Sequence, residues 1–156
     1  MNKKVIGIFI IILVAILTIG SVNATDFENH NFDNYVSMKI PKDMSFEKED
    51  NSIIEEGYKS IDVSYFSEDL VIEYMDTPAF SENSSAYIYQ TFFEVGNDDL
   101  NECYETQDDG LIFLETTQDD GNHISIAGIS SGHKLVIIGG TDSHLVKQIA
   151  QTVKIK

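Results

Sequence analysis

The chain has 156 residues, of which 26 are acidic and 10 are lysine, and its formal net charge is −16 with no arginine. So few cationic side chains argue strongly against nucleic-acid binding and against contact with anionic lipid surfaces. Cys103 is the only cysteine, so no disulfide forms within the chain. We interpret it as a small buried side chain, with pairing to another chain or a nucleophilic role as alternatives.

The N-terminus begins with two lysines, an unbroken apolar run over residues 5–19, and a Val-x-Ala ending at Ala24. The run is shorter than the about 20 residues of a membrane-spanning helix and is typical of a signal peptide. We expect residues 1–24 to be a signal peptide cleaved after Ala24. The alternative is a short N-terminal anchor that contacts the membrane through residues 5–20. Both place residues 25–156, with a formal charge of −18, outside the cytoplasm.

The next part of the chain predicts a tether and three strands. Residues 25–33 are polar and indicate a polar tether. Tyr35–Ile40 alternates between apolar and polar residues and predicts a half-buried strand. A charge-rich stretch, 42–57, follows, with apolar anchors at Phe46 and Ile53–Ile54. The alternating runs 60–66 and 70–75 then predict a β-hairpin.

A helical period replaces the alternation after residue 85. Ala86–Val95 carries apolar residues at helical spacing, with Ser84 or Ser85 as N-cap, and predicts a helix. A buried strand is the alternative, because this stretch is rich in tyrosine and phenylalanine. We expect its aromatic side chains to belong to the core rather than to a ligand groove. Just before it, Asn83 heads an Asn-Ser-Ser sequon and is a candidate N-glycosylation acceptor.

A repeated turn motif dominates the last third of the chain. Thr-Gln-Asp-Asp-Gly occurs at 106–110 and again at 117–121, between strand-like runs. Asp-Gly supplies the positive φ that tight hairpins need, so the motif predicts a meander of short antiparallel strands. The chain then predicts a helix capped by Thr141 or Asp142 and ending near Thr152.

These elements predict one domain over residues 34–156 with an α+β fold. We expect an antiparallel β-sheet, built as a meander with hairpins, that is covered on one face by two helices. Gly128–Gly132 matches the G-x-S-x-G nucleophile elbow of α/β-hydrolases. That elbow requires a following helix, whereas a strand is predicted here, so we interpret the motif as a hairpin turn.

The acidic and histidine residues include no strong metal motif. Asp119, Asp120 and His123 are weak candidates for a Ca²⁺ site, since Ca²⁺ prefers hard oxygen ligands. No segment reproduces the calcium-binding EF-hand loop, and no histidine pair has the spacing of a zinc site. We therefore expect solvated acidic turns, and the sequence predicts no catalytic and no cofactor-binding residue.

Two stretches near the ends resemble a known group of proteins. Tyr35–Asp43, with its strand followed by Ile-Pro-Lys-Asp, resembles the opening of small exported domains of unknown function that are numerous in methanogenic archaea. Val136–Gly140 followed by His144–Lys156 is similar to their closing strand and helix. The layout is also loosely similar to PsbP-like domains. The resemblance implies a compact α+β domain with a non-enzymatic or unknown role, and it carries no functional residues.

Together these features favour a secreted or cell-surface accessory module that binds a protein partner or an envelope component without catalysis. One alternative is a small extracytoplasmic hydrolase that uses acidic residues. A pocket holding two carboxylates with oppositely shifted pKa values would favour that activity. The other alternative is a surface domain that binds divalent cations weakly.

Overall fold

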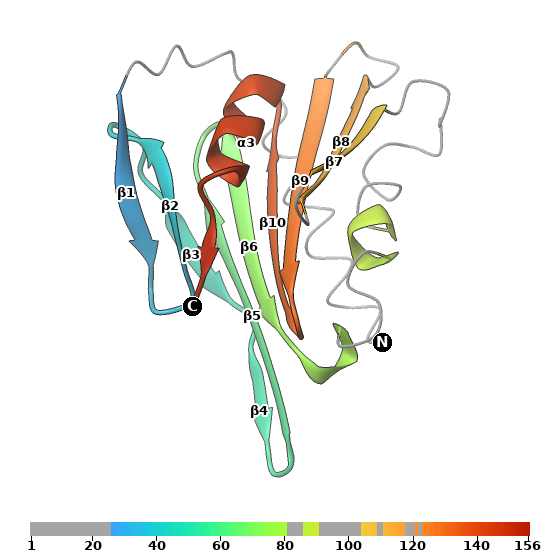
Figure 1. Ribbon diagram of the computed structural model, residues 1–156. Helices are drawn as coiled ribbons and strands as arrows, with labels where there is room; N and C mark the ends of the chain where they lie inside the picture. Colours follow the sequence, from blue (N-terminus) through green and yellow to red (C-terminus); the bar gives the residue numbers. More distant parts are fainter. Residues whose placement is uncertain (1–25, 81–85, 91–103, 109–110, 118–120, 122) are drawn as a thin grey trace.

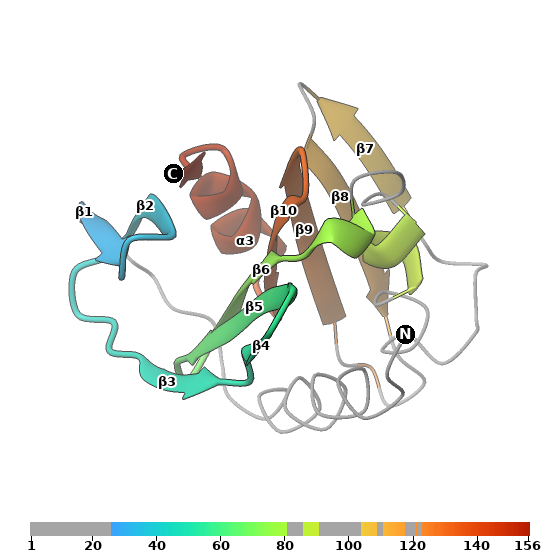
Figure 2. The ribbon, with the colours of Figure 1, turned by 90° about the horizontal axis from the view of Figure 1, so that it is seen from below.

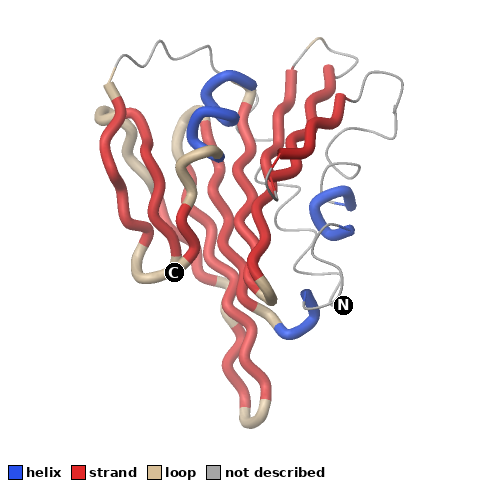
Figure 3. The backbone as a smooth tube through the Cα atoms, viewed as in Figure 1, coloured by secondary structure: helices blue, strands red, loops and turns tan. Residues whose placement is uncertain are grey.

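The computed structural model describes residues 26–80, 86–90, 104–108, 111–117, 121 and 123–156. In these residues the protein is built mainly from antiparallel strands, arranged in two sheets (Figures 1 and 3). No helix within these ranges has the length and apolar character needed to cross a bilayer.

The smaller sheet has three strands in the order β1-β2-β11. They are β1 (Phe27–Phe32), β2 (Val36–Pro41) and β11 (Lys154–Ile155). The expected polar tether over 25–33 is therefore wrong for β1, which pairs with β2 along its whole length. The physical reason lies in Phe32, which is 2% exposed and packs its ring 4.8 Å from the ring of Tyr65.

The larger sheet has eight strands, in the order β3-β5-β6-β10-β9-β8-β7, with β4 beside β5. Their bounds are β3 (Glu47–Asp50), β4 (Ile53–Glu55), β5 (Tyr58–Phe66), β6 (Leu70–Asp76), β7 (Tyr104–Asp108), β8 (Leu111–Thr117), β9 (His123–Ser131) and β10 (Lys134–Gly140). The β5–β6 hairpin and the meander from β7 to β10 are confirmed. Antiparallel pairing of β10 with β6 joins the two units into one sheet.

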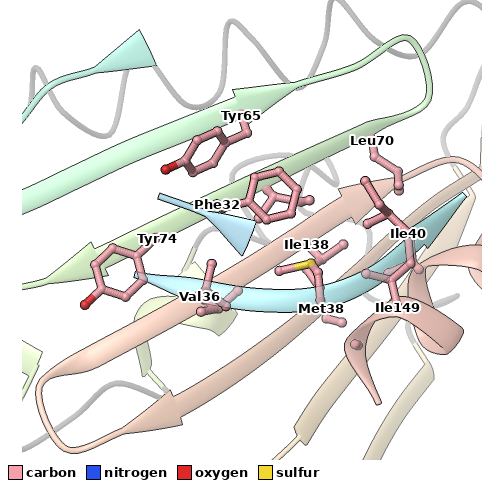
Figure 4. Close-up of a cluster of buried hydrophobic side chains, with 14 of the residues drawn as sticks. Phe32, Val36, Met38, Ile40, Tyr65, Leu70, Tyr74, Ile138 and Ile149 are labelled. Carbon is pink, nitrogen blue, oxygen red and sulfur yellow. The ribbon is translucent and has the colours of Figure 1, made fainter. Parts of the chain in front are cut away.

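The central strands of the large sheet are buried on both faces, since successive side chains of β6 and β10 point to opposite faces and nearly all are buried. We name these faces the α3 face and the far face. On β6 the α3 face carries Leu70, Ile72 and Tyr74, and the far face carries Val71, Glu73 and Met75. The small sheet and α3 (Ser143–Ala150) cover the α3 face (Figure 4).

The helices correct the expected fold class. The protein is mostly β, and its two helical segments lie on opposite faces of the large sheet rather than together on one face (Figure 2). Ile88, in the helical residues 86–90, packs into the far-face core beside Phe80 of the short 3₁₀ helix η1 (Pro78–Phe80). The predicted helix over 86–95 is thus confirmed as far as residue 90, and its remainder lies outside the described residues.

α3 confirms the predicted C-terminal helix. Asp142 is its N-cap, and the Oδ1 atom of Asp142 accepts hydrogen bonds from the backbone N–H groups of His144 and Leu145, both at 3.0 Å. The helix ends at Ala150, slightly before the predicted end near Thr152. Its buried side chains lie against β9 and β10, so this helix and the small sheet together take the place expected for two helices.

A polar cluster connects the small sheet to β3 and β5. The Oδ2 atom of Asp33, in the β1–β2 turn, accepts hydrogen bonds from Lys48 Nζ at 2.7 Å and from the Tyr65 hydroxyl at 2.8 Å. Both hydrogen bonds lower the pKa of Asp33, and the bond from Lys48 has the larger effect. The ionised carboxylate therefore helps to hold the turn against the large sheet.

Candidate functional site

Most residues that the sequence predicted as sites lie outside the described residues. These are the cleavage residue Ala24, the sequon residue Asn83, Cys103, and the acidic candidates Asp119 and Asp120. Of the predicted Ca²⁺ ligands, the structure describes His123 alone. Its Nε2 atom lies 3.2 Å from Glu115 Oε1, and its Nδ1 atom lies 3.3 Å from Thr117 Oγ1. His123 is thus engaged by its cross-strand neighbours on β8, and the Ca²⁺ site stays a prediction.

The other histidines lie apart and have different environments. His133 Nδ1 lies 2.5 Å from Asp76 Oδ1, His144 Nε2 lies 2.9 Å from the side-chain nitrogen of Gln148, and the ring of His30 lies 4.4 Å from that of Phe32 in a tilted arrangement. Among the residues that the structure describes, no group of three or more His, Cys, Asp or Glu side chains is placed to hold a metal ion.

The G-x-S-x-G motif leads into a hairpin turn, as predicted, but Gly128–Ser131 form the end of β9 and only Gly132 lies in the turn itself. β9 ends at Ser131, Gly132 adopts a φ of 61°, and β10 begins at Lys134. A strand rather than a helix follows the serines, so the geometry of a nucleophile elbow is absent at this turn.

The aromatic residues after the sequon also follow their interpretation as core. Tyr87 and Tyr89 pack against the far-face core, and the ring of Tyr87 lies 4.9 Å from that of Phe80. The next two aromatic residues of this stretch, Phe92 and Phe93, lie outside the described residues.

The structure also presents a surface that sequence reasoning missed. The β4–β5 hairpin projects beyond the rest of the large sheet (Figure 1), and we call residues 53–60 the arm. Ile54 lies opposite Lys59 in the arm, and the two-residue turn Glu56-Gly57 joins the strands. Gly57 has a φ of 81°, which a residue with a side chain rarely adopts.

The arm carries all the large hydrophobic side chains that are exposed in the described part of the chain. They are Ile53, Ile54 and Tyr58, which are 37%, 72% and 47% exposed. The expectation that Ile53 and Ile54 anchor their segment in the core is therefore wrong. The pattern Ile-Ile-Glu-Glu-Gly-Tyr was the available signal, because it places apolar residues on both sides of a tight turn. Exposed apolar residues scattered singly need no explanation, but a group on one projecting element makes the arm the candidate binding surface of the described residues.

The base of the arm is held by hydrogen bonds between the β3–β4 connection and β5. The N–H group of Asn51 donates to the backbone carbonyl of Asp62 at 2.8 Å, and the N–H group of Asp62 donates to Ser52 Oγ at 3.1 Å. The N–H group of Ser52 in turn donates to Asp50 Oδ1 at 3.1 Å. Hydrogen bonds from the Ser52 side chain and N–H group lower the pKa of Asp50. These bonds fix the direction in which the arm leaves the sheet.

Beside the same base lies a buried pair of carboxyl groups, Asp62 on β5 and Glu73 on β6. They are 7% and 2% exposed, and their side chains hydrogen-bond each other on the far face. Burial raises the pKa of Asp62, and burial together with the negative charge of Asp62 raises the pKa of Glu73 well above its usual range. Both pKa values shift in the same direction, so this pair lacks the opposed shifts that would favour the hydrolase alternative.

No protein-family model and no curated protein matches the chain. The resemblance of its ends to small exported domains therefore stays a prediction, and the arm and the carboxyl pair are the features from which function has to be inferred.

Proposed function

We propose that this chain is an extracytoplasmic accessory module that binds a protein partner through the arm and performs no catalysis itself. The observation that carries the proposal is the gathering of Ile53, Ile54 and Tyr58, exposed, on one projecting hairpin. Tyrosine is enriched at the centre of protein interfaces, and exposed apolar side chains grouped on one element are typical of interaction sites.

The charges around the arm indicate the chemistry of the partner. Glu55 and Glu56 are exposed beside the apolar side chains, with one exposed cation, Lys59, on the same arm, within a chain whose net charge is −16. A membrane with anionic lipids would repel these carboxylates, and so would a second copy of the arm. The partner that fits is a different protein that contacts both faces of the hairpin, with apolar surface for Ile53 and Tyr58 on one face and for Ile54 on the other, and with lysine or arginine at the rim.

The backbone of β4 offers a second means of contact. Within the described residues β4 pairs with β5 alone, so its outer edge has unused N–H and C=O groups. The neighbouring edge strand β3 carries four exposed charged residues, Glu47–Asp50, which discourage the approach of another strand. β4 has two isoleucines instead, and an extended segment of the partner can pair with it.

The location outside the cytoplasm rests on the sequence of residues 1–24. The basic start, the short apolar run and the ending at Ala24 support export, and the −18 charge of residues 25–156 is consistent with a solvated external domain. Mass spectrometry of the protein from its native host tests this proposal. A chain that begins at Thr25 and is recovered outside the cytoplasm is expected, and a full-length cytoplasmic chain would overturn the location.

Photo-crosslinking tests the binding surface directly. A photo-reactive amino acid is placed at position 54 in the native host, and a control is placed at position 29, which is exposed on β1. We expect a discrete adduct with a second protein from position 54 and none from position 29. Reversing the charges with E55K and E56K should remove the adduct, whereas E28K should not. An adduct of two copies of this chain, an adduct with lipid, or equal adducts from both positions would refute the proposal.

A further inference from the structure

The Asp62–Glu73 pair has a geometry that requires a proton. β5 and β6 are adjacent and antiparallel, with Ser64 opposite Glu73 and Asp62 opposite Met75. Both acids therefore lie on the far face as diagonal cross-strand neighbours. Two ionised carboxylates only accept hydrogen bonds. A hydrogen bond between the side chains of Asp62 and Glu73 therefore needs one of them to be protonated.

The charges around the pair do not compensate for ionisation. Asp50 and Glu49, on β3, add negative charge near Asp62. Lys48, the one cation of β3, is 2.7 Å from Asp33 and 3.7 Å from Asp50 instead. On β10, which pairs with β6, the far face presents Leu135 and Ile137, and the helical residues 86–90 carry no charge.

We propose that Asp62 and Glu73 form a proton-binding site that holds a shared proton at neutral pH and makes the folded protein less stable as the external pH rises. The proposal is independent of the arm and its partner. In the singly protonated pair one carboxyl group donates to the other, and the oxygens Asp62 Oδ1 and Glu73 Oε2 are left without a hydrogen-bond partner, as they are here.

A proton explains the pair better than a divalent cation does. Ca²⁺ takes six to eight oxygen ligands. The far face offers two carboxyl groups and the hydroxyl of Ser64 at this point, and the described residues hold no larger set of metal-binding side chains. Well-packed apolar side chains would be as stable here or more stable, so the two acids are better explained by titration than by stability.

The direction of the pH effect follows from linkage. The pKa values of both groups are higher in the folded protein than their ordinary values of 3.8 and 4.5. The folded state therefore binds more protons than the unfolded state, so the contribution to stability is complete below the ordinary values and is lost as pH rises. A difference of one bound proton changes the folding equilibrium constant about tenfold per pH unit.

Denaturant unfolding of the full chain from about pH 5 upward tests the site. We expect the wild-type folding equilibrium to weaken with pH by up to about tenfold per pH unit more than that of E73Q. The control E28Q removes an exposed charge from β1 and should keep the wild-type slope. D62N provides a second test if E73Q does not fold. Equal slopes for wild type and both variants would overturn the proposal.

Infrared spectroscopy gives a readout that a purely structural role would not change. We expect the C=O stretch of a protonated carboxyl group in the wild-type protein at neutral pH, and its loss in E73Q. Absence of this band in the wild type would overturn the shared proton. Excess Ca²⁺ that stabilises the wild type but neither variant would also overturn it, in favour of a cation site.

Discussion

The contact between Gly128 and Ile88 offers a sharp test of the fold. A Cβ atom built on Gly128 would lie 2.3, 2.7 and 2.9 Å from the Cδ1, Cγ1 and Cγ2 atoms of Ile88. Ile88 is 1% exposed, so its side chain has no solvent space to move into. We expect G128A to destabilise the protein by about 1–3 kcal/mol, the usual cost of overpacking a core. Without this contact, a glycine-to-alanine change at an ordinary φ would stabilise by about 0.4–1 kcal/mol.

A double-mutant cycle identifies the cause of the destabilisation. I88A removes the three clashing atoms and by itself should cost about 2–5 kcal/mol, because it leaves a cavity in the far-face core. In G128A/I88A the added methyl group of residue 128 occupies part of that cavity. The double variant should therefore be more stable than the sum of the two single effects by about 1 kcal/mol or more.

Urea unfolding measures the three free energies, and unchanged m values show that the folded states have similar compactness. A neutral or stabilising G128A, or strictly additive effects, would refute the packing of Ile88 on β9. That result would also remove the basis for placing the helical residues 86–90 on the far face, opposite α3.

Three further outcomes are expected. I54S should change the free energy of unfolding by no more than about 0.5 kcal/mol, since Ile54 is 72% exposed; a large loss of stability would show that Ile54 is packed. D142A should lower helix stability by about 1 kcal/mol through loss of the N-cap, with T141A as a control of little effect in thermal unfolding. The pKa of Asp33 is lowered, mainly by the hydrogen bond from Lys48, so Asp33 stabilises the fold above its ordinary pKa of 3.8 and this contribution is lost as pH falls. D33N should therefore reduce the loss of stability at acid pH, and an unchanged loss would contradict this reasoning.

Local patterns predicted the local structure well. The strand-like runs on either side of Gly132 and the cap at Asp142 indicated the β9–β10 hairpin and α3, because turn chemistry and capping depend on neighbouring residues. Period-two alternation shows that a segment is a strand, but it does not show which other strand the segment pairs with. The β6–β10 pairing, between residues far apart in the chain, was therefore beyond local reasoning.

The fold class could not be inferred from the two predicted amphipathic helices alone. Such a helix shows that it covers an apolar surface, but it does not show which face of a sheet it covers. The continuous apolar run Leu135–Ile138 was the missed signal, because a strand that is apolar on both sides needs cover on both faces. Phe27 and Phe32, at the two ends of a polar stretch, likewise gave too weak a pattern to indicate β1.

The two candidate features depend on three-dimensional placement. Ile54 is exposed because the β4–β5 hairpin extends past its neighbouring strands, and a hairpin's reach is set by sheet register rather than by its own residues. Asp62 and Glu73 are separated by a turn in sequence, and only the register of β5 on β6 brings them together. The pattern Ile-Ile-Glu-Glu-Gly-Tyr indicates a tight turn between apolar residues, but no sequence pattern gives the reach of the hairpin or the pairing of the two acids.

The pairing of β11 with β2 has a consequence for the order of folding. Lys154 and Ile155 complete the small sheet, and the N–H group of Lys156 donates to the backbone carbonyl of Tyr35 at 2.9 Å. The strand that seals the α3 face therefore leaves the ribosome long after β2, its partner. Hairpins such as β9–β10 can form from contacts close in sequence, but closure of this core waits for a non-local pairing with β11. The chain therefore has an inherent delay before the α3 face is closed.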